Sequence, residues 1–253
     1  MLEMIIKQTN GMISNLHIYQ TPEDTARAVA ELILVKAKEK NKLSLPLNIA
    51  LSGGNTPKLL FKLLANEYTN VIPWNLIRLF WVDERCVPPT HEESNYGMTY
   101  ENLLKNLPIH DTNVFPIQGE TDPKTEALRY QHTLEVQLPS ANGFPVFDLI
   151  FLGMGDDGHT ASIFPNDLSL LHSEQSVAVS VHPVTGQNRI TLTGKLINQA
   201  TEVIFLITGA SKAKVLKQII HRETDFENYP ASYIHAQSVP AQFYLDAAAA
   251  QNI

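Results

Sequence analysis

The chain has 253 residues, of which 44% are hydrophobic and 18% charged, so it contains enough apolar sequence for a substantial buried core. Its net charge is −7, from 26 acidic and 19 basic residues, which argues against a nucleic acid or an anionic membrane surface as partner. A single cysteine excludes an internal disulfide, and no membrane span or signal peptide is evident in the sequence, so we expect a cytoplasmic protein.

The chain begins with a predicted strand and a long helix. Residues 1–20 predict a strand or hairpin, with an Asn-Gly turn at 10–11. Residues 22–40 predict a helix, because Thr21 offers a hydroxyl cap and Pro22 suits the first turn. Apolar side chains then recur at helical spacing, which indicates one buried face.

A glycine-containing loop joins the next strand, residues 48–51, to an amphipathic helix, residues 58–64. Paired glycines let backbone N–H groups approach a ligand, and the positive end of the helix favours an anion. A plain strand-to-helix turn capped by Thr56 fits the loop equally well, so both interpretations stay open here. The candidate phosphate-binding residues of this loop are Ser52, Gly53, Gly54, Asn55 and Thr56.

Two acids and a base follow the buried strand predicted over residues 76–82. Asp83, Glu84 and Arg85 could form a surface ion-pair set, which usually contributes little stability. They could equally form a site in which the planar guanidinium of Arg85 binds phosphate. A helix from Ser94 to about 107 is predicted next, and another from 121 to 138.

The loop between these elements contains His91, Glu92 and Glu93, which could suggest a metal site. Their spacing matches no common set of metal ligands. We therefore expect a polar loop there rather than a metal site.

The central stretch starts with an apolar run, residues 149–152, that predicts a buried strand. The glycines that follow match a dinucleotide fingerprint, with Glu174 near the ribose position, and resemble a P-loop with His159 replacing lysine. We reject both, because Asp156 and Asp157 would repel a pyrophosphate. A glycine-rich turn with a capping aspartate is the simpler alternative, but Asp-Gly-His-Thr-Ala-Ser favours a catalytic loop that opens a short helix.

The last third predicts strands at 177–181, 189–193 and 203–207, and a helix at 211–220. Lys212 would lie in the first turn of that helix, where a cation opposes the helix dipole. A bound anion would explain this placement, although a solvated lysine is a common alternative. The final elements predicted are strands at 232–234 and 242–245 and a small helix at 247–250.

Strands and helices alternate along the whole chain, which predicts an α/β fold with a mostly parallel sheet and helices on both faces. We expect one domain over residues 1–253. The candidate polar groups follow strands that end near 51, 82, 153 and 207. They would therefore meet at the carboxyl edge of one sheet, where ligands bind in such folds.

These motifs, taken in order, resemble the glucosamine-6-phosphate isomerase/6-phosphogluconolactonase family, most closely its lactonase branch. The matching stretches cover residues 51–57, 81–88, 94–96, 153–165, 189–193 and 208–213. The resemblance implies a three-layer, Rossmann-like sheet. It also implies hydrolysis of 6-phospho-D-glucono-1,5-lactone to 6-phosphogluconate, without metal or organic cofactor. We accordingly expect a phosphorylated sugar lactone as partner, and a monomeric protein.

The resemblance carries site roles to matching residues. His159 corresponds to the catalytic base, and phosphate recognition falls to the Ser-Gly-Gly loop, Arg85 and Lys212. The deaminase branch is the nearest rival, but it has glutamate five residues after the histidine, where this chain has Phe164. It also tends to have tyrosine where this chain has Arg85. A non-catalytic sugar-phosphate binder is the alternative from a different class.

The expected chemistry is hydrolysis of a cyclic ester. Histidine titrates near pH 6.5, so His159 could accept a proton from water and then protonate the ring oxygen that leaves. Asp157 or Asp83 would orient its ring, and the sequence leaves that choice open. Arg189 is a further candidate cation for phosphate, or else a structural arginine at a strand start. No Gly-x-Ser-x-Gly elbow is present, which argues against a serine acyl-enzyme.

Overall fold

The computed structural model describes residues 15–253, so the predicted turn at 10–11 lies outside the described residues. Its centre is a seven-stranded sheet with the order β1-β12-β11-β8-β2-β3-β5, in which every neighbouring pair is parallel. The strands are β1 (Leu16–Tyr19), β2 (Leu47–Leu51), β3 (Ile77–Trp81), β5 (Val114–Phe115), β8 (Leu149–Leu152), β11 (Glu202–Ile207) and β12 (Gln242–Asp246).

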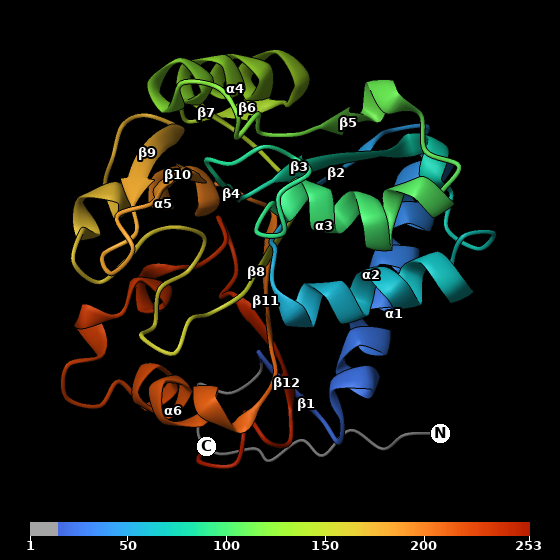
Figure 1. The fold of residues 1–253 in the computed structure, drawn as a ribbon. Helices are drawn as coiled ribbons and strands as arrows, with labels where there is room; N and C mark the ends of the chain where they lie inside the picture. Colours follow the sequence, from blue (N-terminus) through green and yellow to red (C-terminus); the bar gives the residue numbers. More distant parts are fainter. Residues whose placement is uncertain (1–14) are drawn as a thin grey trace.

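Helices and a second, smaller sheet cover the two faces of this sheet. Figure 1 shows α1 (Pro22–Lys42), α2 (Asn55–Glu67) and α3 (Asn95–Asn102) on one side, with α5 (Gly194–Ile197) and α6 (Ala213–His221) on the other. The smaller sheet is antiparallel, with the order β4-β10-β9, and α4 (Pro123–Gln137) packs against it. Its strands are β4 (Asp83–Arg85), β9 (Val177–Val181) and β10 (Asn188–Leu192); β6 (Ser140–Ala141) and β7 (Phe144–Pro145) form a hairpin.

The predicted α/β class and three-layer arrangement are confirmed. Residues of β2 and β8 are all buried, as expected for strands covered on both faces. Thr21 accepts a hydrogen bond from the Asp24 backbone N–H at 3.1 Å, so the predicted cap at the start of α1 is confirmed. The strands expected at 177–181 and 189–193 also exist, but they pair antiparallel with each other outside the main sheet, and β10 also pairs antiparallel with β4.

Several local predictions are wrong. The helix predicted to about 107 ends at Asn102, with a short 3-10 turn beyond it. The predicted strand at 232–234 is instead the end of a 3-10 helix, Pro230–Tyr233, and the residue that follows it, because a proline favours the first turn of a helix and lacks a donor for a sheet. The predicted helix at 247–250 is a turn, which the Asp246 carboxylate holds by accepting from the Ala249 N–H at 2.8 Å.

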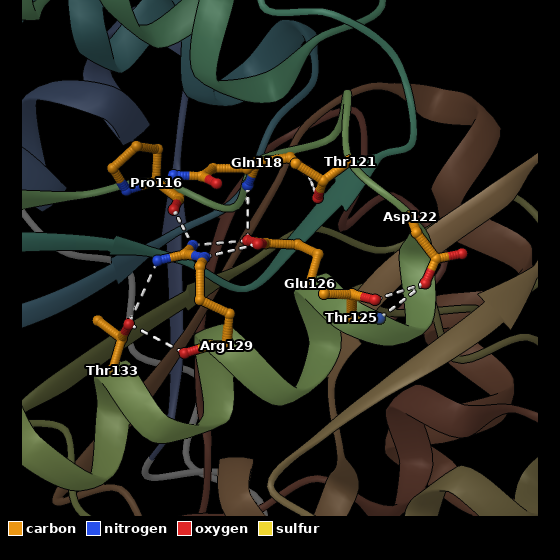
Figure 2. A network of polar contacts seen from close by, with 8 residues as sticks. All are labelled: Pro116, Gln118, Thr121, Asp122, Thr125, Glu126, Arg129 and Thr133. Carbon is orange, nitrogen blue, oxygen red and sulfur yellow. Dashed lines mark hydrogen bonds and ion pairs between the residues drawn. The ribbon is translucent and has the colours of Figure 1, made fainter.

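A polar network fixes α4 to the segment that follows β5 (Figure 2). Glu126 is 1% exposed and accepts hydrogen bonds from the Gln118 backbone N–H at 2.7 Å and from the Arg129 guanidinium at 2.6 Å. Arg129 also donates to the Pro116 carbonyl at 2.9 Å. Asp122 caps the helix by accepting from the Thr125 N–H at 3.0 Å. This network fastens the outer layer, away from the strand ends that form the site.

Candidate active site

A cavity of about 520 Å³ lies where β2, β3, β8 and β11 end, against the small sheet. Its walls come from segments far apart in the sequence, as the alternating fold predicts. Every residue proposed from the sequence for catalysis or phosphate binding lines it except Asp157, whose carboxylate contacts the ring of His159. The lining residues among them are Ser52, Gly53, Gly54, Asn55, Thr56, Asp83, Arg85, His159, Arg189 and Lys212.

The Ser-Gly-Gly loop passes close to the start of α3. A Cβ atom at Gly53 would lie 1.8 Å from Asn95 Oδ1, so only glycine fits there. Ser52 donates to the Phe151 carbonyl at 2.8 Å, which joins the ends of β2 and β8. The α2 cap residue is Gly54 rather than Thr56, whose hydroxyl instead meets that of Thr208 at 2.8 Å. The loop backbone is therefore held open toward the cavity without a side-chain cap.

The loop after β8 presents His159 to the cavity. The His159 Nδ1 and Asp157 Oδ1 atoms are 2.6 Å apart, and the same oxygen accepts from the His159 backbone N–H at 3.2 Å. A Cβ at Gly155 would lie 2.2 Å from His159 Nδ1, so glycine leaves the space the ring occupies. Burial raises the pKa of Asp157, but the hydrogen bond and charge of His159 outweigh it and lower that pKa to about 2.

No helix follows His159, contrary to the prediction from Thr-Ala-Ser. Thr160 and Ile163 instead form a β-bridge, and Ala161 adopts a left-handed conformation with φ of 49°. Thr160 donates to the Gly153 carbonyl at 2.9 Å, which closes the loop on itself. These local contacts compete with helix formation and leave the ring of His159 beside that of Phe164, with centroids 4.8 Å apart.

The second candidate aspartate has other partners. Asp83 is 7% exposed, and its carboxylate accepts from Ser162 Oγ at 2.6 Å and from Asn95 Nδ2 at 3.2 Å. Neighbouring Glu84 is 1% exposed and accepts from the backbone N–H groups of Asn95 at 2.7 Å and Tyr96 at 2.8 Å. Burial raises the pKa of Glu84 to about 7 against these hydrogen bonds. The acidic pair thus anchors the start of α3 and one cavity wall.

Two arginines stand side by side on the small sheet, because Arg85 and Arg189 are register partners in β4 and β10. Arg189 is 9% exposed and has neither a hydrogen bond from its guanidinium nor an ion pair within residues 15–253. Burial and the charge of Arg85 lower the pKa of Arg189, against smaller opposing effects of Asp83, Glu93 and Glu84. Arg85 donates to the Glu93 carbonyl, and its buried Nε has no partner among the described residues. This wall of the cavity therefore offers unmatched positive charge to an anion.

Lys212 faces the same cavity from the segment after β11. It lies in a 3-10 turn just before α6, rather than inside the first turn of the helix as predicted. Its Nζ is 2.6 Å from Asp156 Oδ1, which also accepts from Ser211 Oγ at 3.0 Å. Both contacts lower the pKa of Asp156. A ligand anion that binds Lys212 would therefore have to replace the Asp156 carboxylate.

Across residues 15–253, no group of three or more His, Cys, Asp or Glu side chains is placed to hold a metal ion. The same part of the chain has no helix long and apolar enough to cross a membrane.

The family model described as glucosamine-6-phosphate isomerases/6-phosphogluconolactonase matches residues 20–243. The chain belongs to this family. It is 42% identical over 228 residues to 6-phosphogluconolactonase of Haemophilus influenzae, covering 89% of this chain and 95% of the relative. It is 41% identical over 203 residues to the protein of that name from Treponema pallidum, covering 80% and 83% respectively.

A solved structure within the family has the same architecture. The 6-phosphogluconolactonase of Trypanosoma brucei matches with a TM-score of 0.84 at 31% identity, over 96% of this chain and all of that one (100%). Family membership thus agrees with the resemblance seen in the motifs, and with the position of the cavity at the strand ends.

Sequence analysis missed several cavity residues. Asn95 and Ser162 stand inside motifs quoted for the family resemblance, but nothing in their spacing showed that both would bond Asp83. Ser211 lies within the matching stretch 208–213, but no pattern in the sequence marks it as a partner of Asp156. His182 was not singled out at all, although it follows a predicted strand, which is the signal that pointed to the other site residues.

Proposed function

We propose that the protein is a 6-phosphogluconolactonase that hydrolyses 6-phospho-D-glucono-1,5-lactone to 6-phosphogluconate, a step of the oxidative pentose phosphate pathway. One observation carries this assignment. The same cavity joins a histidine–carboxylate pair, suited to proton transfer, to two arginines that form no ion pair with a carboxylate of residues 15–253 and are suited to a phosphate. The lactonase names of the relatives support this pairing of chemistry and substrate.

His159 would act first as general base. With Nδ1 bound to the Asp157 carboxylate, the ring proton lies on Nδ1 and the lone pair on Nε2 is available to a water molecule. The water attacks the lactone carbonyl carbon while its proton passes to Nε2. Asp157 stabilises the imidazolium that forms, the role a carboxylate has in hydrolytic triads.

The same group would complete the reaction as general acid. When the tetrahedral intermediate collapses, the bond from carbon to the ring oxygen breaks, and the imidazolium proton passes to that oxygen. The product is an open-chain carboxylic acid, and His159 returns to its neutral form. General acid–base help of this kind contributes about 10²–10⁴-fold in rate. Asp83 would take no part in orienting His159, because its oxygens bond Ser162 and Asn95.

Phosphate binding would fall to the two arginines of the small sheet. Arg85 and Arg189 present guanidinium groups that bind phosphate oxygens in pairs, and the Ser-Gly-Gly loop adds backbone N–H groups. Lys212 adds a point charge once its contact with Asp156 opens. Binding energy gained there holds the lactone carbon at His159.

The deaminase alternative finds no support at the residue that separates the two branches. Phe164 is 3% exposed, and its ring packs on that of His159. An apolar ring cannot assist ring opening of an amino sugar, although it can shield the imidazole from bulk water. A non-catalytic binder would need the cavity but not the His159–Asp157 pair.

We also propose that the protein works as a monomer in the cytoplasm. The His159–Asp157 pair and the two arginines that the proposed chemistry needs all belong to the same chain, so the proposed site needs no residue from a second copy. The one cysteine, partly buried Cys86, is free, which fits a reducing compartment. Elution at the size of one 28.2 kDa chain would agree with the first point.

The direct test is an initial-rate assay of lactone loss with purified protein, corrected for spontaneous hydrolysis. We expect strong acceleration with the phosphorylated lactone, and no release of ammonia from glucosamine 6-phosphate. Binding of 6-phosphogluconate without acceleration of hydrolysis would identify a non-catalytic binder and contradict the assignment.

A further inference from the structure

His182 stands at the point where β9 enters the tight turn to β10. Its backbone N–H donates to the Gln187 carbonyl at 2.9 Å, and its carbonyl accepts from the Gly186 N–H at 2.9 Å. The ring caps the turn from inside: Nδ1 accepts from the backbone N–H groups of Val184 and Thr185, both at 3.2 Å. The backbone and the ring of His182 are therefore both fixed by the turn.

These two contacts decide where the ring proton is. A nitrogen that accepts from N–H groups must carry a lone pair, so the single proton of neutral His182 lies on Nε2. Burial lowers the pKa of His182, and the charges of Arg189, His159 and Arg85 act in the same direction, against an opposing effect of Asp157. The ring is thus a neutral hydrogen-bond donor through Nε2.

His182 also lines the cavity, as Arg85 and Arg189 do. It packs edge-on against Phe164, with centroids 5.1 Å apart, and Phe164 in turn contacts the ring of His159. Phe164 therefore contacts both histidine rings, and His182 is near enough to Arg189 and Arg85 for their charges to lower its pKa. A neutral N–H donor in that position matches an anionic oxygen that the arginines also bind.

We infer that His182 is a substrate-binding residue whose Nε2–H donates a hydrogen bond to the phosphate of the lactone, beside Arg189. The inference rests on the proposed function, since it takes the phosphate of that substrate as the acceptor. The β9–β10 turn would then contribute to substrate specificity, because its N–H groups keep the proton of His182 on Nε2. In this arrangement His159 and His182 are opposite in function, one accepting protons at the lactone and the other donating a hydrogen bond to the phosphate.

Two substitutions separate substrate binding from turn structure. In His182→Asn, the Asn oxygen can accept from the N–H two residues on, as in an Asx-turn, so the turn is kept while the Nε2 donor is lost. In His182→Gln, the amide nitrogen reaches the place of Nε2, so the donor is kept while the turn cap is lost. If His182 only stabilises the turn, the Asn variant should resemble the wild type more than the Gln variant does. If His182 donates to the phosphate, the Gln variant should bind the substrate better than the Asn variant does.

We expect the His182→Asn variant to have the same unfolding temperature as the wild type. Its KM for the phosphorylated lactone should be about tenfold higher, which is the effect of losing one hydrogen bond to a charged group. Its kcat, and its KM for unphosphorylated D-glucono-1,5-lactone, should not change. His182→Gln should recover most of the lost affinity. An unchanged KM in His182→Asn, an equal rise for both lactones, or a fall in kcat alone would overturn the inference.

A binding experiment keeps this inference separate from the proposed function. Calorimetric titration with 6-phosphogluconate should show about tenfold weaker binding to His182→Asn than to wild type, whether or not either protein is active. In the nitrogen NMR spectrum of histidine-labelled protein, the His182 signals should show a bare Nδ1 and a protonated Nε2. A proton on Nδ1 would contradict the tautomer on which the inference depends.

Discussion

Arg129 and Arg189 differ in burial and in whether the protein supplies them with hydrogen-bond partners. Arg129 on α4 binds Glu126 through two nitrogens and the Pro116 carbonyl through one of them (Figure 2). Arg189 on β10 is more deeply buried, at 9% exposure, and within residues 15–253 its guanidinium has no hydrogen bond. In the first arrangement the protein itself neutralises the charge, whereas in the second the guanidinium is available to bind an anionic ligand.

The difference shows how stability and function are divided in the fold. A buried cation without a partner costs free energy, so a sequence selected for stability alone would pair or replace it. Arg189 lies at the carboxyl edge of the strands beside Arg85, whereas Arg129 lies in the outer layer. The unpaired charge is therefore found where the fold binds ligands, and the paired one where it only holds elements together.

The largest expected effect is at the cavity. His159→Ala removes the group proposed to move both protons and should lower kcat by about 10²–10⁴-fold. The variant should fold and bind 6-phosphogluconate as wild type does, because the arginine wall is untouched. Turnover within a few-fold of wild type would remove His159 from the mechanism.

The outer network should respond in stability alone. Glu126→Ala leaves Arg129 without its carboxylate and the Gln118 N–H without an acceptor, so we expect a loss of about 2–3 kcal/mol in the free energy of unfolding. Urea denaturation measures this, with Glu135→Ala on the same helix as an exposed control. A changed KM with unchanged stability would contradict the division between the two regions.

A substitution of Arg189 in the cavity should change KM and leave stability nearly unchanged. Arg189→Ala removes an unpaired charge, so its unfolding free energy should stay within about 1 kcal/mol of wild type. Its KM for the phosphorylated lactone should rise about ten- to a hundredfold, with little change for unphosphorylated gluconolactone. A marked loss of stability would show that Arg189 is a structural arginine.

The smallest effect concerns acid stability. The folded pKa of Asp157 is about 2, below its ordinary 3.8, so the folded state binds this proton less tightly than the unfolded chain. Its contribution is present above about pH 4 and is lost as the pH falls toward 2. Asp157→Asn should therefore be less stable than wild type at neutral pH, and the difference should shrink over that window. Urea midpoints at pH 7, 4 and 2 measure it; a constant difference would contradict the contact.

The sequence predicted the α/β class and the elements that surround the cavity because those depend on local pattern. Apolar runs such as 149–152, glycine-rich loops and capping residues act over a few positions. What it could not predict depends on pairing between distant segments. The small antiparallel sheet is one case, since nothing local in residues 189–193 distinguishes pairing with β4 from a place in the main sheet.

The same reasoning separates the aspartates and explains His182. Asp157 reaches the ring of its near neighbour His159, while Asp83 bonds Ser162, 79 positions away, a contact that no local pattern encodes. No local pattern marks His182, because the contacts that fix its tautomer and its place in the same cavity as Arg189 exist only in the folded chain.

The central claim is that one cavity pairs lactone hydrolysis at His159 with phosphate recognition by unmatched arginines. The most direct measurement is the ratio of kcat/KM for 6-phosphogluconolactone to that for gluconolactone, in wild type and in Arg189→Ala, after subtraction of spontaneous hydrolysis. We predict a strong preference for the phosphorylated lactone that falls about ten- to a hundredfold in the variant. Equal ratios in the two proteins, or no preference in wild type, would contradict the account.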